Sequence, residues 1–168
     1  RWWNSPITSA PYCSRFFKNT YSVLKEEYIK TGKLRYVYRD FPLSFHKQAQ
    51  KAHETASCAG EQGKYWEMHD SIFRDQKKMQ VDDLREKAQL LGVEMSAFNS
   101  CLDSGKYEQE IKKDISDGTK AGVRGTPSFV LGKTDPSGSV KGIFIRGAQP
   151  TAYFKNQIDQ LLKQVSSK

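Results

Sequence analysis

The chain has 168 residues, 37% of them apolar and 12% aromatic, which suits one hydrophobic core with an inserted lobe rather than two independent domains. Its net charge of +8 comes from basic residues scattered among glutamates, and we find no RNA-recognition motif, zinc knuckle or Walker loop, so nucleic acid is not an expected partner. No apolar run approaches the ~20 residues that cross a bilayer and no signal peptide opens the chain, so we expect a protein that does not span a membrane.

The first predicted element is a helix that begins at Pro11. Residues 1–9 are too few and too irregular for a full leading strand, so we expect a truncated or partly disordered start. Proline suits the first turn of a helix, and Gly32 marks the end of this one. Apolar residues recur at helical spacing at Phe17, Tyr21, Leu24 and Tyr28. Cys13 lies on the same stripe, which leaves two interpretations open, a small buried hydrophobe and a redox cysteine.

A strand and a block of helices are predicted next. Residues 34–38 are β-formers and predict a strand, which Pro42 ends. Helical periodicity with glycine punctuation then predicts four helices, at residues 48–59, 65–73, 81–91 and about 106–120. In the second of these, the spacing of three aromatic side chains predicts that they lie in the core of the lobe: Tyr65, Trp66 and Phe73.

The β pattern returns in the last third of the chain. Residues 128–131 and 140–145 predict two strands, and the turn-rich segment 132–138 between them predicts a hairpin. Apolar residues from 154 to 162 predict a C-terminal amphipathic helix. The order of strand, helix block, hairpin and helix therefore predicts an α/β fold with a helical insertion.

Two short motifs outline a thiol-disulfide site. Residues 10–13 read Ala-Pro-Tyr-Cys at the start of the first helix, and residues 123–129 read Val-Arg-Gly-Thr-Pro-Ser-Phe before the hairpin. In a C-x-x-C site, backbone N–H groups at the helix start hold the first sulfur as a thiolate. Alanine at position 10 cannot attack a disulfide, so the attacking member of the pair is missing.

Together with segments 38–43, 58–66 and 101–107, these motifs resemble the DsbA-like family of thiol-disulfide oxidoreductases over Pro11 to about Leu162. The resemblance implies an α/β thioredoxin-like fold with an inserted helical domain. Its boundaries are residues 1–44 and 121–168 for the thioredoxin-like domain, and residues 45–120 for the helical insertion.

The resemblance also implies roles for individual residues at the start of the first helix. Ala10 occupies the position of the nucleophilic cysteine, and Cys13 occupies that of the resolving cysteine. Pro11 and Tyr12 lie between the two sulfur positions and would tune thiolate stability by shaping the first turn. An exposed Tyr12 would also contact substrate.

On the opposite side of the expected groove, the resemblance places Gly125, Thr126 and Pro127. A cis Thr126-Pro127 bond would present backbone N–H and C=O groups to an extended substrate segment, which would add as a short β pairing. The alternative interpretation is that Pro127 merely begins a strand.

A structural disulfide between Cys58 and Cys101 is expected by analogy with similar pairs in some family members, and two buried free thiols are the competing interpretation. Restoring a cysteine at position 10 would give an even number of cysteines. The three histidines, His46, His53 and His69, show no metal-ligand spacing, so we predict no metal site, and we interpret His69 as a packed or hydrogen-bonded helix residue.

The leading functional hypothesis is a bacterial extracytoplasmic protein thiol-disulfide oxidoreductase of the periplasm or cell envelope, carrying an engineered alanine at its first active-site position and therefore inactive. The resemblance implies cysteine-containing protein substrates, no diffusible cofactor, and recycling by a membrane or soluble redox partner. A catalytically silent peptide-binding or chaperone-like protein is the alternative. A glutathione-dependent enzyme ranks last, because alanine offers no hydroxyl to activate glutathione.

Overall fold

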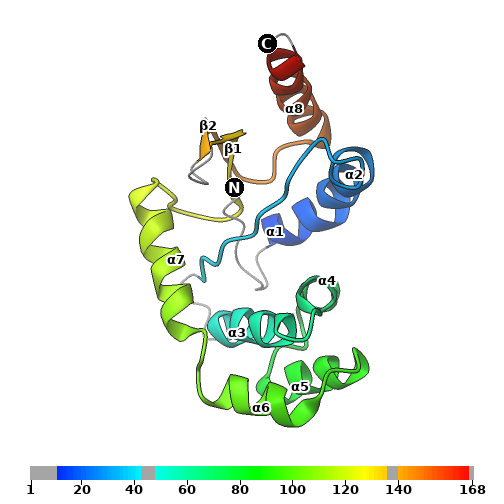
Figure 1. Ribbon diagram of the computed structural model, residues 1–168, viewed down its shortest axis with the longest axis vertical. Coiled ribbons are helices and arrows are strands. Elements are labelled where there is room, and N and C mark those ends of the chain that lie inside the picture. The colour runs from blue at the N-terminus through cyan, green and yellow to red at the C-terminus, as the bar shows by residue number, and fades with distance from the viewer. Residues whose placement is uncertain (1–10, 43–47, 136–139, 167–168) are drawn as a thin grey trace.

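The computed structural model describes residues 11–42, 48–135 and 140–166, and it has the predicted α/β architecture. Figure 1 shows helices α3 to α6 gathered at one end of the molecule and the two strands with α2 and α8 at the other, with α7 running alongside both parts. Two hydrophobic clusters correspond to these two ends. Ala10, His46 and residues 1–9, where a truncated or partly disordered start is expected, lie outside the described residues.

The first helical run covers residues 11–29 and carries the motif cysteine. It is α-helical in α1 (Pro11–Arg15) and α2 (Ser22–Leu24), and its turns widen to π-helical geometry in η1 (Phe16–Tyr21) and η2 (Lys25–Ile29). Gly32 follows with φ at +73°, where glycine is least strained, and this ends the run as predicted.

The helices gathered at one end are α3 (Ala49–Gly60), α4 (Tyr65–Arg74), α5 (Val81–Leu90) and α6 (Met95–Asp103), and α7 (Glu108–Lys120) follows them in the chain. Small alanines on α3 let the neighbouring helices approach closely, and Ala52, Ala56 and Ala59 are fully buried. The four predicted helices are present, and α6 adds one whose bounds the periodicity did not delimit.

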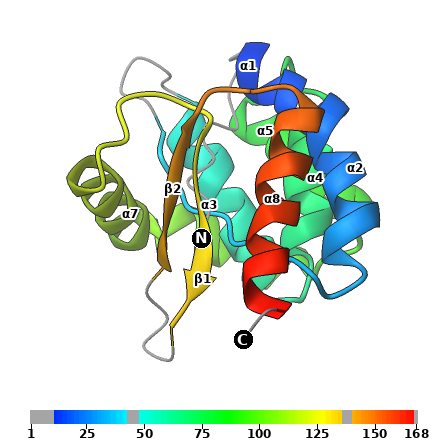
Figure 2. The same cartoon turned by 90° about the horizontal axis from the view of Figure 1, so that it is seen from above.

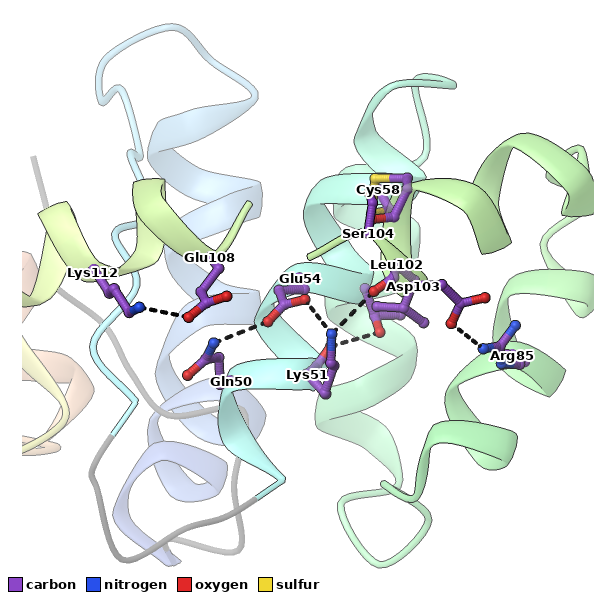
Figure 3. Close-up of polar contacts among 12 residues, drawn as sticks. Gln50, Lys51, Glu54, Cys58, Arg85, Leu102, Asp103, Ser104, Glu108 and Lys112 are labelled. Atoms are coloured by element: carbon purple, nitrogen blue, oxygen red, sulfur yellow. Dashed lines mark hydrogen bonds and ion pairs between the residues drawn. A yellow bond between two sulfur atoms is a disulfide. The ribbon is translucent and has the colours of Figure 1, made fainter. Parts of the chain in front are cut away.

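A disulfide joins α3 to α6. The Sγ atoms of Cys58 and Cys101 are 2.03 Å apart, so the bridge implied by the resemblance is present and the two cysteines are not free thiols. Beside it, the Lys51 ammonium donates to the buried Glu54 carboxylate at 2.6 Å and to the Leu102 carbonyl at 3.0 Å, as Figure 3 shows. A covalent bond and a charge-assisted contact therefore hold the same two helices together.

The hairpin and the last helix build the second hydrophobic cluster. Strands β1 (Ser128–Thr134) and β2 (Val140–Arg146) pair antiparallel, with Phe129 opposite Ile145. Helix α8 (Thr151–Ser166) lies beside the hairpin in Figure 2, and Phe154 contacts Phe129 with ring centroids 5.0 Å apart. Phe16 of the first helical run packs against both rings, so this cluster fixes the first helical run relative to the hairpin.

Two β predictions are wrong in detail. Residues 34–38 form no ladder among the described residues, where the sheet has two strands, β1 and β2. β-forming side chains favour extended backbone, but a strand also needs a partner for its N–H and C=O groups. Residues 132–134, predicted as turn, belong to β1, because Gly132 lies opposite Gly142 and two glycines let the strands continue as a pair.

Trp66 also departs from its prediction. Its neighbours Tyr65 and Phe73 contact the lobe core, but Trp66 is 38% exposed, because it points off the buried face of α4.

The domain boundaries at residues 44 and 120 stay predictions. Within the described ranges, no helix has the length and apolar character needed to cross a bilayer.

Candidate active site

Cys13 is the third residue of α1, and it lies in the apolar core rather than at the surface. Its side chain is fully buried in the hydrophobic cluster formed mainly by helices α3 to α6. Burial raises the pKa of the Cys13 thiol to about 12, because a thiolate loses its hydration there, and a polar contact with the Thr126 side chain opposes the increase. Cys13 is therefore a neutral thiol in the folded chain at physiological pH.

The turn before β1 supplies the opposite wall of the site. The Thr126-Pro127 peptide bond is cis, the form that the resemblance implied. Ser128 Oγ donates a hydrogen bond to the Gly125 carbonyl at 2.6 Å, and the Gly147 amide donates to the Pro127 carbonyl at 2.8 Å. These bonds anchor the turn to the start of β1 and to the end of β2.

A surface groove of about 360 Å³ lies where these segments meet. Tyr12, 57% exposed, lines it from α1, and residues 124–128 line it from the turn. Arg146 and Gly147 complete it from the end of β2. The two distant motifs are thus brought together: the buried Cys13 thiol is in polar contact with Thr126, and Tyr12 lies at the surface.

Sequence reasoning missed the contribution of Arg124 and Arg146 to this groove. Arg124 belongs to the second motif, but no role was predicted for its side chain in the groove. Arg146 lies opposite Ser128 in the hairpin register, which places it next to the turn. Only the register of the hairpin could have identified Arg146, and that register depends on which residues pair across the two strands.

Aromatic and imidazole side chains pack behind Cys13. The rings of Tyr38 and His69 meet edge to face at 4.9 Å, and burial strongly raises the pKa of Tyr38. His69 is fully buried, as interpreted, and its Nδ1 lies 3.0 Å from Asp70 Oδ1. Among the described residues, neither Tyr38 Oη nor His69 Nε2 has a hydrogen-bond partner. Cys13 is buried in the same cluster that Tyr38 packs against, and this burial disfavours a thiolate.

The burial of His69 makes the stability of the fold sensitive to acid. Desolvation lowers the pKa of His69, although Asp70 opposes the decrease, whereas the unfolded chain takes up that proton near pH 6.5. The unfolded state therefore binds more protons than the folded state below pH 6.5, and stability decreases as pH falls. If His69 stays neutral when folded, its contribution to the loss between pH 7 and pH 5.5 is about 1 kcal/mol.

Urea unfolding at the two pH values tests this prediction. In His69→Gln, we expect the difference in unfolding free energy between pH 7 and pH 5.5 to shrink by about 1 kcal/mol, whatever the absolute stability of the variant. An unchanged difference would show that His69 does not resist protonation in the fold.

The chain resembles known proteins over most of its length. The family model described as Thioredoxin matches residues 8–143. A Rickettsia bellii protein named as a protein-disulfide oxidoreductase is 30% identical over 158 residues, which are 90% of this chain and 60% of that protein. The Na(+)/H(+) antiporter NhaA 3 of Salinispora tropica is 32% identical over 122 residues, which are 72% of this chain and 18% of the antiporter. The chain thus spans less than two thirds of the length of these relatives.

Among solved structures, the fold matches alpha-DsbA1 of Wolbachia pipientis. The TM-score is 0.83 at 27% identity, and the match covers 99% of this chain and 87% of that structure. The fold, the paired motifs and these similarities agree with one another. The chain therefore belongs to the thioredoxin family and, within it, to the DsbA-like proteins.

Proposed function

We propose that this chain is the scaffold of a protein thiol-disulfide oxidoreductase in which Ala10 occupies the position of the attacking cysteine. One observation carries the proposal: buried Cys13, at the start of α1, is in polar contact with Thr126, which lines a groove together with Pro127 and exposed Tyr12. A substrate segment lying in this groove would pass directly over the start of α1.

The chemistry requires a cysteine at position 10. In the oxidised form, positions 10 and 13 would share a disulfide. A substrate thiolate would attack the sulfur at position 10, forming a mixed disulfide and releasing Cys13 as the leaving group. A second substrate thiolate would attack the substrate sulfur, form the substrate disulfide and release the sulfur at position 10. The substrate loses two electrons and two protons, and the protein gains them as two thiols.

With alanine at position 10 this cycle cannot start. Cys13 remains a buried neutral thiol with no cysteine three residues earlier, so the chain can neither form a disulfide at this site that would accept two electrons from substrate nor resolve a mixed disulfide. We propose that the chain as it stands is inactive in exchange while its groove stays intact.

The setting of this activity is part of the proposal. The Rickettsia bellii relative is named for protein disulfides, which supports cysteine-containing proteins as substrates. The Cys58 to Cys101 bridge supports an oxidising, extracytoplasmic compartment, because structural disulfides persist mainly there. A membrane or soluble redox partner would then remove or supply the two electrons of each cycle.

The Ala10→Cys variant tests the proposal, with Ala10→Ser as a matched control of similar size. We expect Ala10→Cys to oxidise a reduced two-cysteine peptide, or to reduce insulin, at least about tenfold faster than the chain as it stands. Ala10→Ser should give no increase, because a hydroxyl forms no mixed disulfide. Equal rates for the cysteine and serine variants would reject the oxidoreductase function.

The groove itself favours a second candidate, a catalytically silent peptide-binding protein. Tyr12 and the backbone of the Thr126 turn are present whether or not position 10 carries sulfur. Under this alternative, peptide affinity would not depend on any thiol. Loss of peptide binding after Cys13 is chemically blocked in a chain that remains folded would count against it.

A further inference from the structure

Three arginines surround the groove. Arg124 and Arg146 line it, and the guanidinium of Arg15 lies over the Tyr12 ring, 5.6 Å from the ring centroid. All three side chains are exposed. They come from three separate segments, α1, the turn before β1 and the end of β2, so the fold concentrates them at one place.

Among the described residues, no acidic side chain neutralises these positive charges at the groove. The described residues that line the groove include no aspartate or glutamate. Within the ranges that the structure describes, no carboxylate pairs with Arg15, Arg124 or Arg146. Arginine stays protonated at every physiological pH, so the groove carries unpaired positive charge that a ligand can meet.

Several basic residues elsewhere on the surface are paired with carboxylates. Several lysines on helices pair with carboxylates one turn away: Lys30 with Glu26, Lys112 with Glu108, and Lys113 with Asp117. A surface for nucleic acid needs a continuous basic track, and these pairs interrupt one. Arg124 and Arg146 differ from these paired lysines because they line a groove and have no carboxylate partner among the described residues.

We propose that the groove selects polypeptide segments in which aspartate or glutamate flanks the target cysteine. This inference rests on the proposed function, because it names the substrate class of the same groove. A planar guanidinium binds a carboxylate through two parallel hydrogen bonds, and Arg124 and Arg146 lie on the two chain segments that border Pro127. An extended segment over Pro127 would bring acidic side chains before and after its cysteine to these two arginines.

Peptide titrations followed by amide NMR test the selection on the chain as it stands, without any redox step. Three ten-residue peptides share a central serine in place of cysteine and differ in flanks of glutamate, glutamine or lysine. At an ionic strength of about 20 mM, we expect the glutamate peptide to bind at least about tenfold more tightly than the lysine peptide. The preference should decrease to below about threefold in about 0.5 M salt.

Charge-reversal variants show whether the groove or the net charge is responsible. Arg124→Glu/Arg146→Glu should abolish or invert the preference. The matched control Lys77→Glu/Lys78→Glu changes two exposed residues between α4 and α5 and lowers the net charge from +8 by the same amount, yet it should keep the preference. If the reversal variant does not fold, Arg124→Gln/Arg146→Gln should still lower the preference by at least about threefold.

Several outcomes would overturn the inference. Equal affinities for the three peptides, no saturable shifts at residues 124–128 with any peptide, or an equal loss of preference in the lysine control would each do so. The Ala10→Cys rate separates this inference from the proposed function. A charge preference without exchange activity in Ala10→Cys would reject the oxidoreductase function alone, and activity without a charge preference would reject the selection alone.

Discussion

Cys13 in the folded chain should react with iodoacetamide at pH 8 about a thousandfold more slowly than in the chain unfolded by urea. The thiolate is the reacting species, and burial raises the pKa of the Cys13 thiol from 9.0 to about 12. At pH 8 the thiolate fraction is roughly one tenth for a pKa of 9.0 and roughly one in ten thousand for a pKa of 12. The lack of access to a buried sulfur would slow the native reaction further.

Intact mass with time measures this reaction and counts thiols in the same experiment. The unfolded chain without reductant should take up one alkyl group, on Cys13, and three only after reduction of the Cys58 to Cys101 disulfide. A native rate within about tenfold of the unfolded rate would contradict the buried, neutral state of Cys13. Three labels without reductant would contradict the disulfide.

Replacing Asp114 by alanine should lower the free energy of unfolding by about 2–4 kcal/mol. Its carboxylate is 6% exposed and accepts hydrogen bonds from the Arg39 guanidinium and, at 3.0 Å, from the Asp40 backbone amide. Burial raises the pKa of Asp114 while these two donors lower it, so the carboxylate depends on both partners. Without the Asp114 carboxylate, the Arg39 guanidinium and the Asp40 amide have no acceptor on α7. The polar contact between residues 34–42 and α7 is then lost.

Urea melts of three variants measure the effect. Asp114→Asn keeps an oxygen acceptor for one donor, so we expect it to lose less stability than Asp114→Ala. Asp117→Ala, on the same helix, removes an exposed pair with Lys113 and should change stability little. Equal stabilities for Asp114→Ala and Asp117→Ala would show that the buried contact does not hold residues 34–42 to α7.

The sequence contained most of the fold, because hydrophobic periodicity and turn residues act locally. The stripe from Phe17 to Tyr28 determined the first helical run, and the two β-rich segments separated by residues 132–138 determined the hairpin. Periodicity does not show whether a predicted strand has a neighbouring strand to pair with. Residues 34–38 have the composition of a strand, yet they form no β-ladder among the described residues, where the sheet consists of β1 and β2.

Only the part of the candidate site that lies in local sequence motifs could be predicted. Tyr12, Cys13 and Thr126 belong to recognisable motifs, and the structure brings them together at one groove. Arg146 has no motif, and it reaches the groove because hairpin pairing places it opposite Ser128. Charge gathered from separate segments depends on tertiary structure, so the sequence alone could not reveal it.

The most direct test of the account is mixed-disulfide trapping with two variants that differ only at Cys13. Ala10→Cys and Ala10→Cys/Cys13→Ala are each incubated with a disulfide-linked peptide, and their masses are followed with time. We expect the double variant to accumulate a one-to-one mixed disulfide that persists until dithiothreitol is added, whereas Ala10→Cys releases its peptide through Cys13. Release at equal rates from both variants would contradict the account, because Cys13 would then play no part in exchange.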